Sequence, residues 1–150
     1  MADEENLVER EIRIAATPET VFTFFTDPQK MVRWMGSMAL LETRPGGLYK
    51  VVIGDRIARG RFLEVVPYTR IVFTWGWEGE GPVPPDSTTV EITLEREGRE
   101  TVLRLAHRLL TAEARETHDR GWEHYLARLA VAAGGGDPGP DPMAITMPAS

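Results

Sequence analysis

The histidines are the residues of this sequence best suited to chemistry, and one of them lies within an apolar pattern. His107 follows Thr101, Leu103 and Leu105 at a spacing of two residues. Residues that alternate in this way point to the same side of a β-strand, so His107 is predicted to point inward. An inward histidine can orient a ligand or carry a proton. The alternative, which we favour, is a structural histidine bonded to the backbone or to water.

A second histidine, His118, lies one helical turn before Trp122 in the stretch HDRGWEHYLARL. Only a short turn separates the expected strand of His107 from the expected helix of His118. The two rings are therefore expected to approach each other if the strand end meets the helix start. Two histidines without a third ligand make a poor zinc site, so no metal is predicted. His124 lies off the apolar stripe of the helix and is expected to face solvent.

No further catalytic set stands out. The candidate acids Glu64, Glu91 and Glu123 have no spacing that pairs them, and the sequence has no cysteine nucleophile. Phosphate loops, HExxH and GxSxG are all missing from the sequence. Arg59 and Arg61 can clamp a carboxylate, although a solvated strand face is the interpretation that we favour. The sequence thus predicts no cofactor and argues against an enzyme, except for a cyclase or aromatase that only shapes its substrate.

Large aromatic side chains are spread over several expected elements. Trp34, Trp75, Trp77, Trp122 and Tyr125 can line a ligand pocket or simply fill a core, and the pattern leaves both interpretations open.

A glycine in the middle of the long C-terminal helix is more specific. Gly121 lies on the apolar stripe of that helix, where glycine costs about 1 kcal/mol relative to alanine. Either the close approach of a strand or space for a ligand must offset this cost. Close packing against a strand is the interpretation that we favour.

The composition sets limits on the class of protein. The 150 residues are 42% hydrophobic, which suits one domain with a core or with a core and a cavity. A net charge of −6 argues against nucleic acid as the main partner. No long apolar run or secretory signal is present, and the chain has no cysteine. A cytoplasmic protein without a membrane span is therefore expected.

The hydrophobic period changes twice along the chain. Residues 7–15 alternate as a first strand, and Thr17, Pro18 and Glu19 form a helix start. Residues 40–109 alternate with a period of two and are interrupted by turn residues, which predicts six antiparallel strands. The helical period returns at about Ala112 and ends at the glycines 134–136. The order predicts an α+β domain in which a curved antiparallel sheet of about seven strands wraps a long C-terminal helix.

The stretch TDPQKMVRWMG, residues 26–36, predicts a second short helix from Pro28 to about Met35. About two turns cannot stand alone in water, yet this piece carries Met31, Trp34 and Met35. Together with the preceding helix it lies between the first and second strands. We therefore expect the two short helices to act as a lid that closes the space between the sheet and the long helix.

The stretches TPETVFTFFTDPQKMVRWMG, GRFLEVVPYTRIVFTW, LRLAHRLL and HDRGWEHYLARL resemble the activator of heat shock protein ninety ATPase homologue (AHSA-type) family. That family belongs to the START-like (SRPBCC) superfamily of helix-grip folds, and the resemblance covers residues 8 to about 133. Where many relatives have two tryptophans before the glycine of the short helix, this chain has Trp34 and Met35. The resemblance implies a cavity between sheet and helix for a hydrophobic small molecule.

The sequence therefore predicts a flexible N-terminus (1–6), a helix-grip domain (7–134) and a disordered tail rich in proline and glycine (135–150). The expected function is binding of a hydrophobic or aromatic small molecule. A chaperone-associated interaction module with a role in the stress response and a cyclase or aromatase remain as alternatives, and a homodimer is an open possibility. The predicted cavity-lining residues are Phe25, Trp34, Met35, Phe73, Trp75, Trp77, His107, His118, Gly121, Trp122 and Tyr125.

Overall fold

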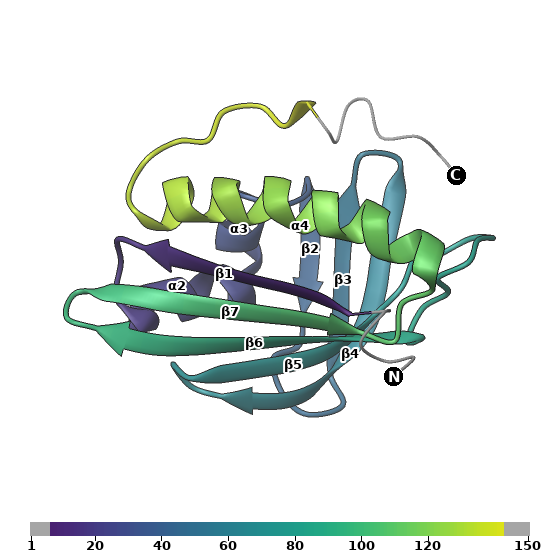
Figure 1. Cartoon of the computed structure of the whole chain (residues 1–150), viewed down its shortest axis with the longest axis horizontal. Coiled ribbons are helices and arrows are strands. Elements are labelled where there is room, and N and C mark those ends of the chain that lie inside the picture. Colours follow the sequence, from purple (N-terminus) through teal and green to yellow (C-terminus); the bar gives the residue numbers. More distant parts are fainter. Residues whose placement is uncertain (1–6, 143–150) are drawn as a thin grey trace.

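The computed structural model describes residues 7–142 and confirms the predicted helix-grip architecture (Figure 1). A strand is followed by two short helices, six further strands and a long helix, as the change of hydrophobic period predicted. The elements are β1 (Val8–Ile14), α2 (Pro18–Thr26), α3 (Pro28–Met31), β2 (Met38–Leu41), β3 (Leu48–Ile53), β4 (Arg56–Val66), β5 (Arg70–Trp75), β6 (Thr88–Glu97), β7 (Glu100–Arg108) and α4 (Ala112–Ala133).

The strands form one antiparallel sheet in the order β1-β7-β6-β5-β4-β3-β2. Figure 1 shows this sheet curving around α4, which lies lengthwise along one of its faces. The first strand pairs with the last, so the chain crosses from β1 to the opposite edge at β2 and then returns strand by strand to β7. This topology places the inward residues of β5, β6 and β7 opposite the buried stripe of α4.

Each helix begins at a polar cap that the sequence supplies. The Thr17 side chain accepts a hydrogen bond from the Thr20 N–H, and Pro18 follows at the first helical position. Asp27 caps α3 in the same way, and the Thr111 hydroxyl accepts the Ala114 N–H at 3.1 Å at the start of α4. These caps fix where the chain turns from strand to helix.

The second short helix ends earlier than predicted. It stops at Met31, and the chain reaches Gly36 through turns. Gly36 has a φ of 86°, which favours glycine, and a Cβ there would lie 2.6 Å from the carbonyl oxygen of Val52. The turns still bury Trp34 and Met35 completely or nearly so.

An arginine on the inner face of β1 is explained by a partner on α4. The Arg10 guanidinium donates to the Asp119 carboxylate at 2.9 Å, and Glu123 lies 3.6 Å away. The side chain thus bridges strand and helix at the edge of the core instead of entering it.

The segment after α4 differs from the predicted disordered tail. Residues 143–150 and 1–6 lie outside the described residues, but the chain from Gly134 to Pro142 turns back along α4 (Figure 1). Backbone carbonyls of residues 138–140 accept hydrogen bonds from Arg128, and the Asp141 carboxylate is bonded to α4. Composition alone missed this packing because it does not show that side chains of the preceding helix fold onto the segment. We call residues 134–142 the strap.

Candidate functional site

A cluster of aromatic and histidine rings fills the space between β5, β7 and the first half of α4. The His107 and His118 ring centroids lie 5.2 Å apart, so the two imidazoles approach each other as expected. The Trp122 ring centroid lies 6.1 Å from that of His107, and the Trp77 ring centroid lies 6.2 Å from that of His118. We call these four residues, together with Thr88, the histidine cluster.

His107 is fully buried, and both of its ring nitrogens have partners. The Trp122 indole N–H donates to His107 Nδ1 at 2.9 Å, so this nitrogen carries no proton. Nε2 then carries the hydrogen and donates it to the Thr88 hydroxyl at 2.8 Å, while Thr88 donates to the Trp75 carbonyl at 2.7 Å. The chain of bonds fixes a neutral imidazole in one tautomer.

His118 is held in the opposite tautomer. The Trp77 indole N–H donates to Nε2 at 3.1 Å, and Nδ1–H donates to the Ala114 carbonyl at 2.8 Å, one turn back along α4. Indole N–H groups only donate and carbonyl oxygens only accept, so this assignment is the one that satisfies all four groups. Neither histidine retains a free nitrogen for a substrate.

The surroundings keep both histidines neutral. Burial lowers the pKa of His107 well below its ordinary value, and the nearby His118 lowers this pKa further. Burial also lowers the pKa of His118, against the opposing effect of its bond to the Ala114 carbonyl, and the Arg56 charge lowers it further. The arrangement supports a structural role for both histidines, in agreement with the interpretation favoured for His107.

Two buried polar atoms next to this cluster have no hydrogen-bond partner. They are the Tyr49 hydroxyl on β3 and the Trp75 indole nitrogen at the end of β5, and the residues are 1% and 3% exposed. Their ring centroids are 6.0 Å apart. Buried donors are rarely left unpaired because each costs about 1–3 kcal/mol. We call Tyr49 and Trp75 the unpaired donors.

The unpaired donors pack against other aromatic rings. Phe73 stacks on Tyr49 with centroids 4.1 Å apart, and Phe62 meets Tyr49 edge-on at 5.7 Å. Trp75 continues this surface toward Trp122 at 5.5 Å. Burial raises the pKa of Tyr49 far above its ordinary value, so the phenol stays protonated and can donate. The arrangement can receive an acceptor atom that is surrounded by apolar rings.

Gly121 faces open space. A Cβ built at this position would meet no heavy atom within 4 Å outside the helix's own neighbouring backbone. The close approach of a strand, favoured from the sequence, is therefore wrong. Of the two explanations for a glycine here, open space beside the helix is the one that the structure supports.

The flank of α4 that carries Gly121 also holds the strap. Tyr125 donates its hydroxyl hydrogen to Asp141 Oδ2 at 2.6 Å, and His124 Nε2 lies 2.7 Å from Asp141 Oδ1. Arg128 donates to the carbonyls of Trp34 and Gly139 at 3.0 and 2.9 Å. His124, expected to face solvent, is half-buried because the strap covers it.

The other predicted cavity-lining residues lie away from the rings around Trp75. Phe25 and Trp34 meet edge-on at 5.2 Å, and the Trp34 indole donates to the Phe24 carbonyl at 2.9 Å. With Met35 they form a buried group at the α2–α3 end of the core. The structure brings Trp75 and five other predicted residues into one group of rings, and places five elsewhere: Phe25, Trp34, Met35, Gly121 and Tyr125.

The remaining candidates contribute little to a site. Arg59 pairs with Glu78 at 3.1 Å, and Glu64 and Glu91 pair with arginines on the solvated face of the sheet. A surface groove of about 240 Å³ is lined by Glu9, Arg10, Glu11, Glu91, Thr93, Arg104, Leu105 and Ala106. Within residues 7–142, no three histidine or acidic side chains gather closely enough to hold a metal ion. No helix in this part of the chain is long and apolar enough to cross a membrane.

Comparison with known proteins now adds to this geometry. The family described as Activator of Hsp90 ATPase homolog 1-like protein matches residues 15–134. The chain belongs to this family. An AHSA1-like protein from Rhizobium etli, solved in solution, is 52% identical over 91% of this chain and 86% of its own, with a TM-score of 0.73. The predicted resemblance and its START-like fold are thus confirmed.

Solved structures with lower sequence identity share the fold. DynU16, from the dynemicin biosynthetic locus, is 24% identical over 89% of this chain and 49% of its own, with a TM-score of 0.77. An Hsp90 activator from Plasmodium falciparum is 24% identical over 86% of this chain and 96% of its own, with a TM-score of 0.73. A search of curated proteins finds no match for this chain. The AHSA1-like family is therefore established, and the ligand or partner is not.

The sequence analysis missed Tyr49, together with Thr88 and Phe62, as residues of the candidate site. Tyr49 lies in LYKVVI, where this residue, Val51 and Ile53 alternate toward the inner face. This period was the available signal, since it places the phenol among apolar neighbours. Whether its hydroxyl finds a partner depends on strands β4 and β5, which the local pattern cannot show.

Proposed function

We propose that this AHSA1-like protein binds a small apolar or aromatic molecule between the inner face of the sheet and α4. The observation that carries the proposal is the pair of unpaired donors, the Tyr49 hydroxyl and the Trp75 indole N–H. Both lie inside an aromatic environment, where water is a less favourable partner than in a polar one. A bound molecule with a suitable acceptor atom would supply the missing hydrogen-bond partner.

The chemistry of the two donors specifies part of the ligand. An indole N–H can only donate, and a protonated phenol donates well, so both suit an oxygen acceptor such as a ketone, quinone or ether. The surrounding rings of Phe62, Phe73 and Trp122 favour a flat aromatic body. The ligand class is therefore an aromatic molecule that carries a neutral acceptor oxygen.

No acid–base step is part of this proposal. The nitrogen atoms of His107 and His118 are bonded within the protein, which argues against the cyclase or aromatase alternative that used them. Binding and release of an unchanged molecule fit the geometry better.

The proposal is tested with prodan, a fluorescent aromatic ketone whose emission reports an apolar environment. Tyr49→Phe keeps the stacked ring and removes the donor, so the affinity should fall about fivefold or more. Tyr68→Phe is the matched control, because Tyr68 is 48% exposed and its ring packs on Phe22 instead. Its affinity should equal that of the unaltered protein.

Two results would overturn the proposal. If prodan does not bind to the unaltered protein, no aromatic ketone site exists between sheet and α4. If Tyr49→Phe binds prodan as tightly as Tyr68→Phe, the hydroxyl has another partner, such as a buried water.

A second candidate is a chaperone-associated role, and the family itself favours it. The relative from Plasmodium falciparum is described as an Hsp90 activator, and another from Colwellia psychrerythraea as an Aha1 dimer. Such a role would use the surface, so Tyr49→Phe would leave stimulation of an Hsp90 ATPase unchanged. Any stimulation in a coupled ATPase assay, together with no prodan binding, would favour this candidate.

A further inference from the structure

We propose that Tyr125, His124 and Arg128 form a carboxylate-binding site on the flank of α4, which the chain's own Asp141 occupies. The inference rests on the proposed function. It adds that the preferred ligand carries a carboxylate, which takes the position of Asp141 and displaces the strap while the apolar body enters beside α4.

The first support is how Asp141 is held. One carboxylate oxygen accepts from the Tyr125 hydroxyl at 2.6 Å, and the other lies 2.7 Å from His124 Nε2. An ionised carboxylate only accepts, so both partners donate, each to a different oxygen. The Asp141 side chain is 11% exposed, although it comes from a surface segment. This is a two-donor recognition of a carboxylate, carried out within one chain.

The second support is the cation next to these donors. Arg128 is one turn after His124 and Tyr125, so the three side chains leave the same side of α4. Its guanidinium now donates to strap carbonyls, at 2.9 Å to Gly139 and 3.4 Å to both Pro138 and Pro140. If the strap moves away, these N–H groups lose their partners. They then become available to an incoming carboxylate, for which guanidinium is well suited.

The third support is that polar contacts join the strap to α4. No residue from Gly134 to Pro142 is buried, so the segment contributes little apolar surface to the fold. Its contacts with α4 include hydrogen bonds to His124, Tyr125 and Arg128, which an external carboxylate can replace. Segments of this kind open at low cost in free energy.

The space for the rest of the ligand lies one turn back along α4. Gly121 precedes Tyr125 on this flank and faces open space, so a molecule whose carboxylate is bound at Tyr125 can place its apolar body there. Tyr125 is 4% exposed and connects this flank to the core. The ligand class is thus narrowed to an aromatic molecule with a neutral acceptor oxygen that also carries a carboxylate.

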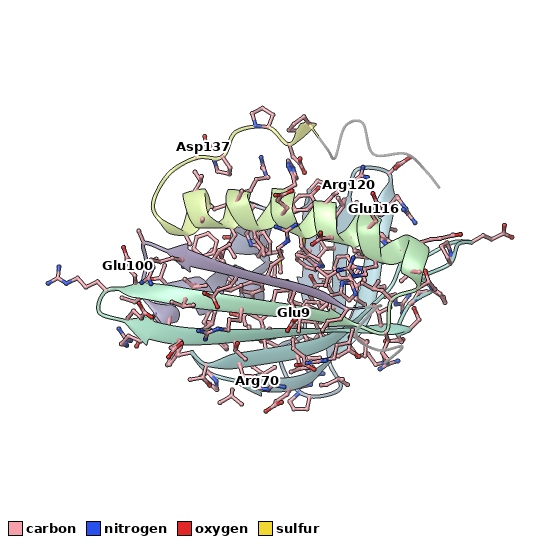
Figure 2. The ribbon with its side chains drawn as sticks, in the orientation of Figure 1. Glu9, Arg70, Glu100, Glu116, Arg120 and Asp137 are labelled. Atoms are coloured by element: carbon pink, nitrogen blue, oxygen red, sulfur yellow. The ribbon has the colours of Figure 1, made fainter. Side chains whose placement is uncertain are left out.

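The test compares two fluorescent probes, dansylaminoundecanoic acid and its methyl ester, which lacks the negative charge and carries one additional methyl group. Asp141→Ala removes the internal competitor and should raise the affinity for the acid about tenfold or more, with little effect on the ester. Asp137→Ala is the matched control. It removes a carboxylate from the same strap, where Asp137 accepts only the Gly139 N–H and extends away from α4 (Figure 2).

A second variant tests whether the Tyr125 hydroxyl binds the carboxylate of the acid. In the Asp141→Ala background, adding Tyr125→Phe should lower the affinity for the acid and leave that for the ester unchanged. The proposal is overturned if Asp141→Ala changes acid and ester alike, if Asp137→Ala has the same effect, or if Tyr125→Phe makes no difference.

A separate measurement does not depend on the proposed function. Sodium acetate has no apolar body, so it should shift the His124 ring resonances of Asp141→Ala and leave those of the unaltered protein in place. If acetate shifts His124 but neither dansyl probe binds, the carboxylate site stands and the binding function fails. If acetate has no effect on Asp141→Ala, the carboxylate site itself is wrong.

Discussion

The histidine cluster and the unpaired donors are neighbours in the same core, yet their polar atoms differ in hydrogen bonding. In the cluster, His107 and His118 have partners for all four ring nitrogens. A few ångströms away, Tyr49 and Trp75 each bury a polar atom with none. The region whose hydrogen bonds are complete is the one that we assign to stability, and the region with missing partners is the one that we propose for binding.

This difference in hydrogen bonding points to Tyr49 and Trp75, and away from the histidines, as candidate functional residues. The imidazoles are the groups best suited to chemistry, but Trp77, Thr88, Trp122 and the Ala114 carbonyl satisfy their four ring nitrogens. Tyrosine and tryptophan attract less attention because they are ordinary core residues. The structure therefore shifts the candidate site from the histidines to the unpaired donors.

The largest effect should follow from breaking the complete network. Trp122→Phe removes the donor to His107 Nδ1 and leaves a small void, so the free energy of unfolding should fall by about 2–4 kcal/mol. Urea denaturation measures this, with Val131→Ala as a control at an exposed position of the same helix. A loss below about 1 kcal/mol would mean that the network contributes little to stability.

The next effect is a dependence of stability on pH. The pKa values of His107 and His118 are lowered in the folded state from an ordinary value of 6.5. Below that pH the unfolded chain binds protons that the folded protein does not, so the stability present above pH 6.5 is lost on acidification. The slope is up to about 1.4 kcal/mol per pH unit for each histidine.

Urea denaturation at about pH 7.5 and about pH 5.5 checks this, in a window above the ordinary range of carboxyl pKa values. His107→Gln, which cannot become charged, should have a shallower slope between the two conditions. Equal slopes for the variant and the unaltered protein would show that His107 titrates in the folded state as it does in the unfolded chain.

Substitution of an unpaired donor should have the opposite effect on stability to Trp122→Phe. Without ligand, Tyr49→Phe removes a buried hydroxyl that has no partner, so stability should stay level or rise by about 1 kcal/mol. Thermal unfolding beside Tyr68→Phe measures this. A loss of more than about 1 kcal/mol would show that the hydroxyl is bonded, and the contrast between the two regions would fail.

The smallest effect concerns the open flank of α4. Gly121→Ala adds a methyl group that meets nothing within 4 Å, so the gain in helix propensity should appear as about 0.5 kcal/mol of added stability. Thermal unfolding detects it. A loss of stability would place a neighbour next to Gly121 in solution and remove the space proposed for the ligand.

Much of the fold follows from local patterns. Alternation over residues 40–109, the helix start at Thr17 and the apolar stripe of α4 predicted the order of elements, and the resemblance supplied the helix-grip arrangement. The strap was not predicted, because glycine and proline signal irregular backbone without showing whether it packs. Its contacts depend on Arg128 and Tyr125, whose partners a local pattern does not reveal.

The candidate site was predictable only in part. The inward direction of His107 followed from strand period, and Trp75 was among the predicted cavity-lining residues; their ring centroids lie 6.1 Å apart. The strand period could not show whether each buried polar atom has a hydrogen-bond partner, because a partner such as Thr88 or Trp122 comes from another element. Gly121 shows the same limit, because its neighbours across the fold decide between close packing and open space.

The central claim is that Trp75 and Tyr49 donate to a bound acceptor, and the indole resonances of the protein test it most directly. Trp34, Trp77 and Trp122 already donate to acceptors within the protein, whereas Trp75 does not. In a proton–nitrogen correlation spectrum with prodan added, the Trp75 indole signal, assigned with Trp75→Phe, should move the most and toward lower field. If prodan binds and the Trp75 signal moves no more than the other three, the ligand does not meet the unpaired donors and the account is wrong.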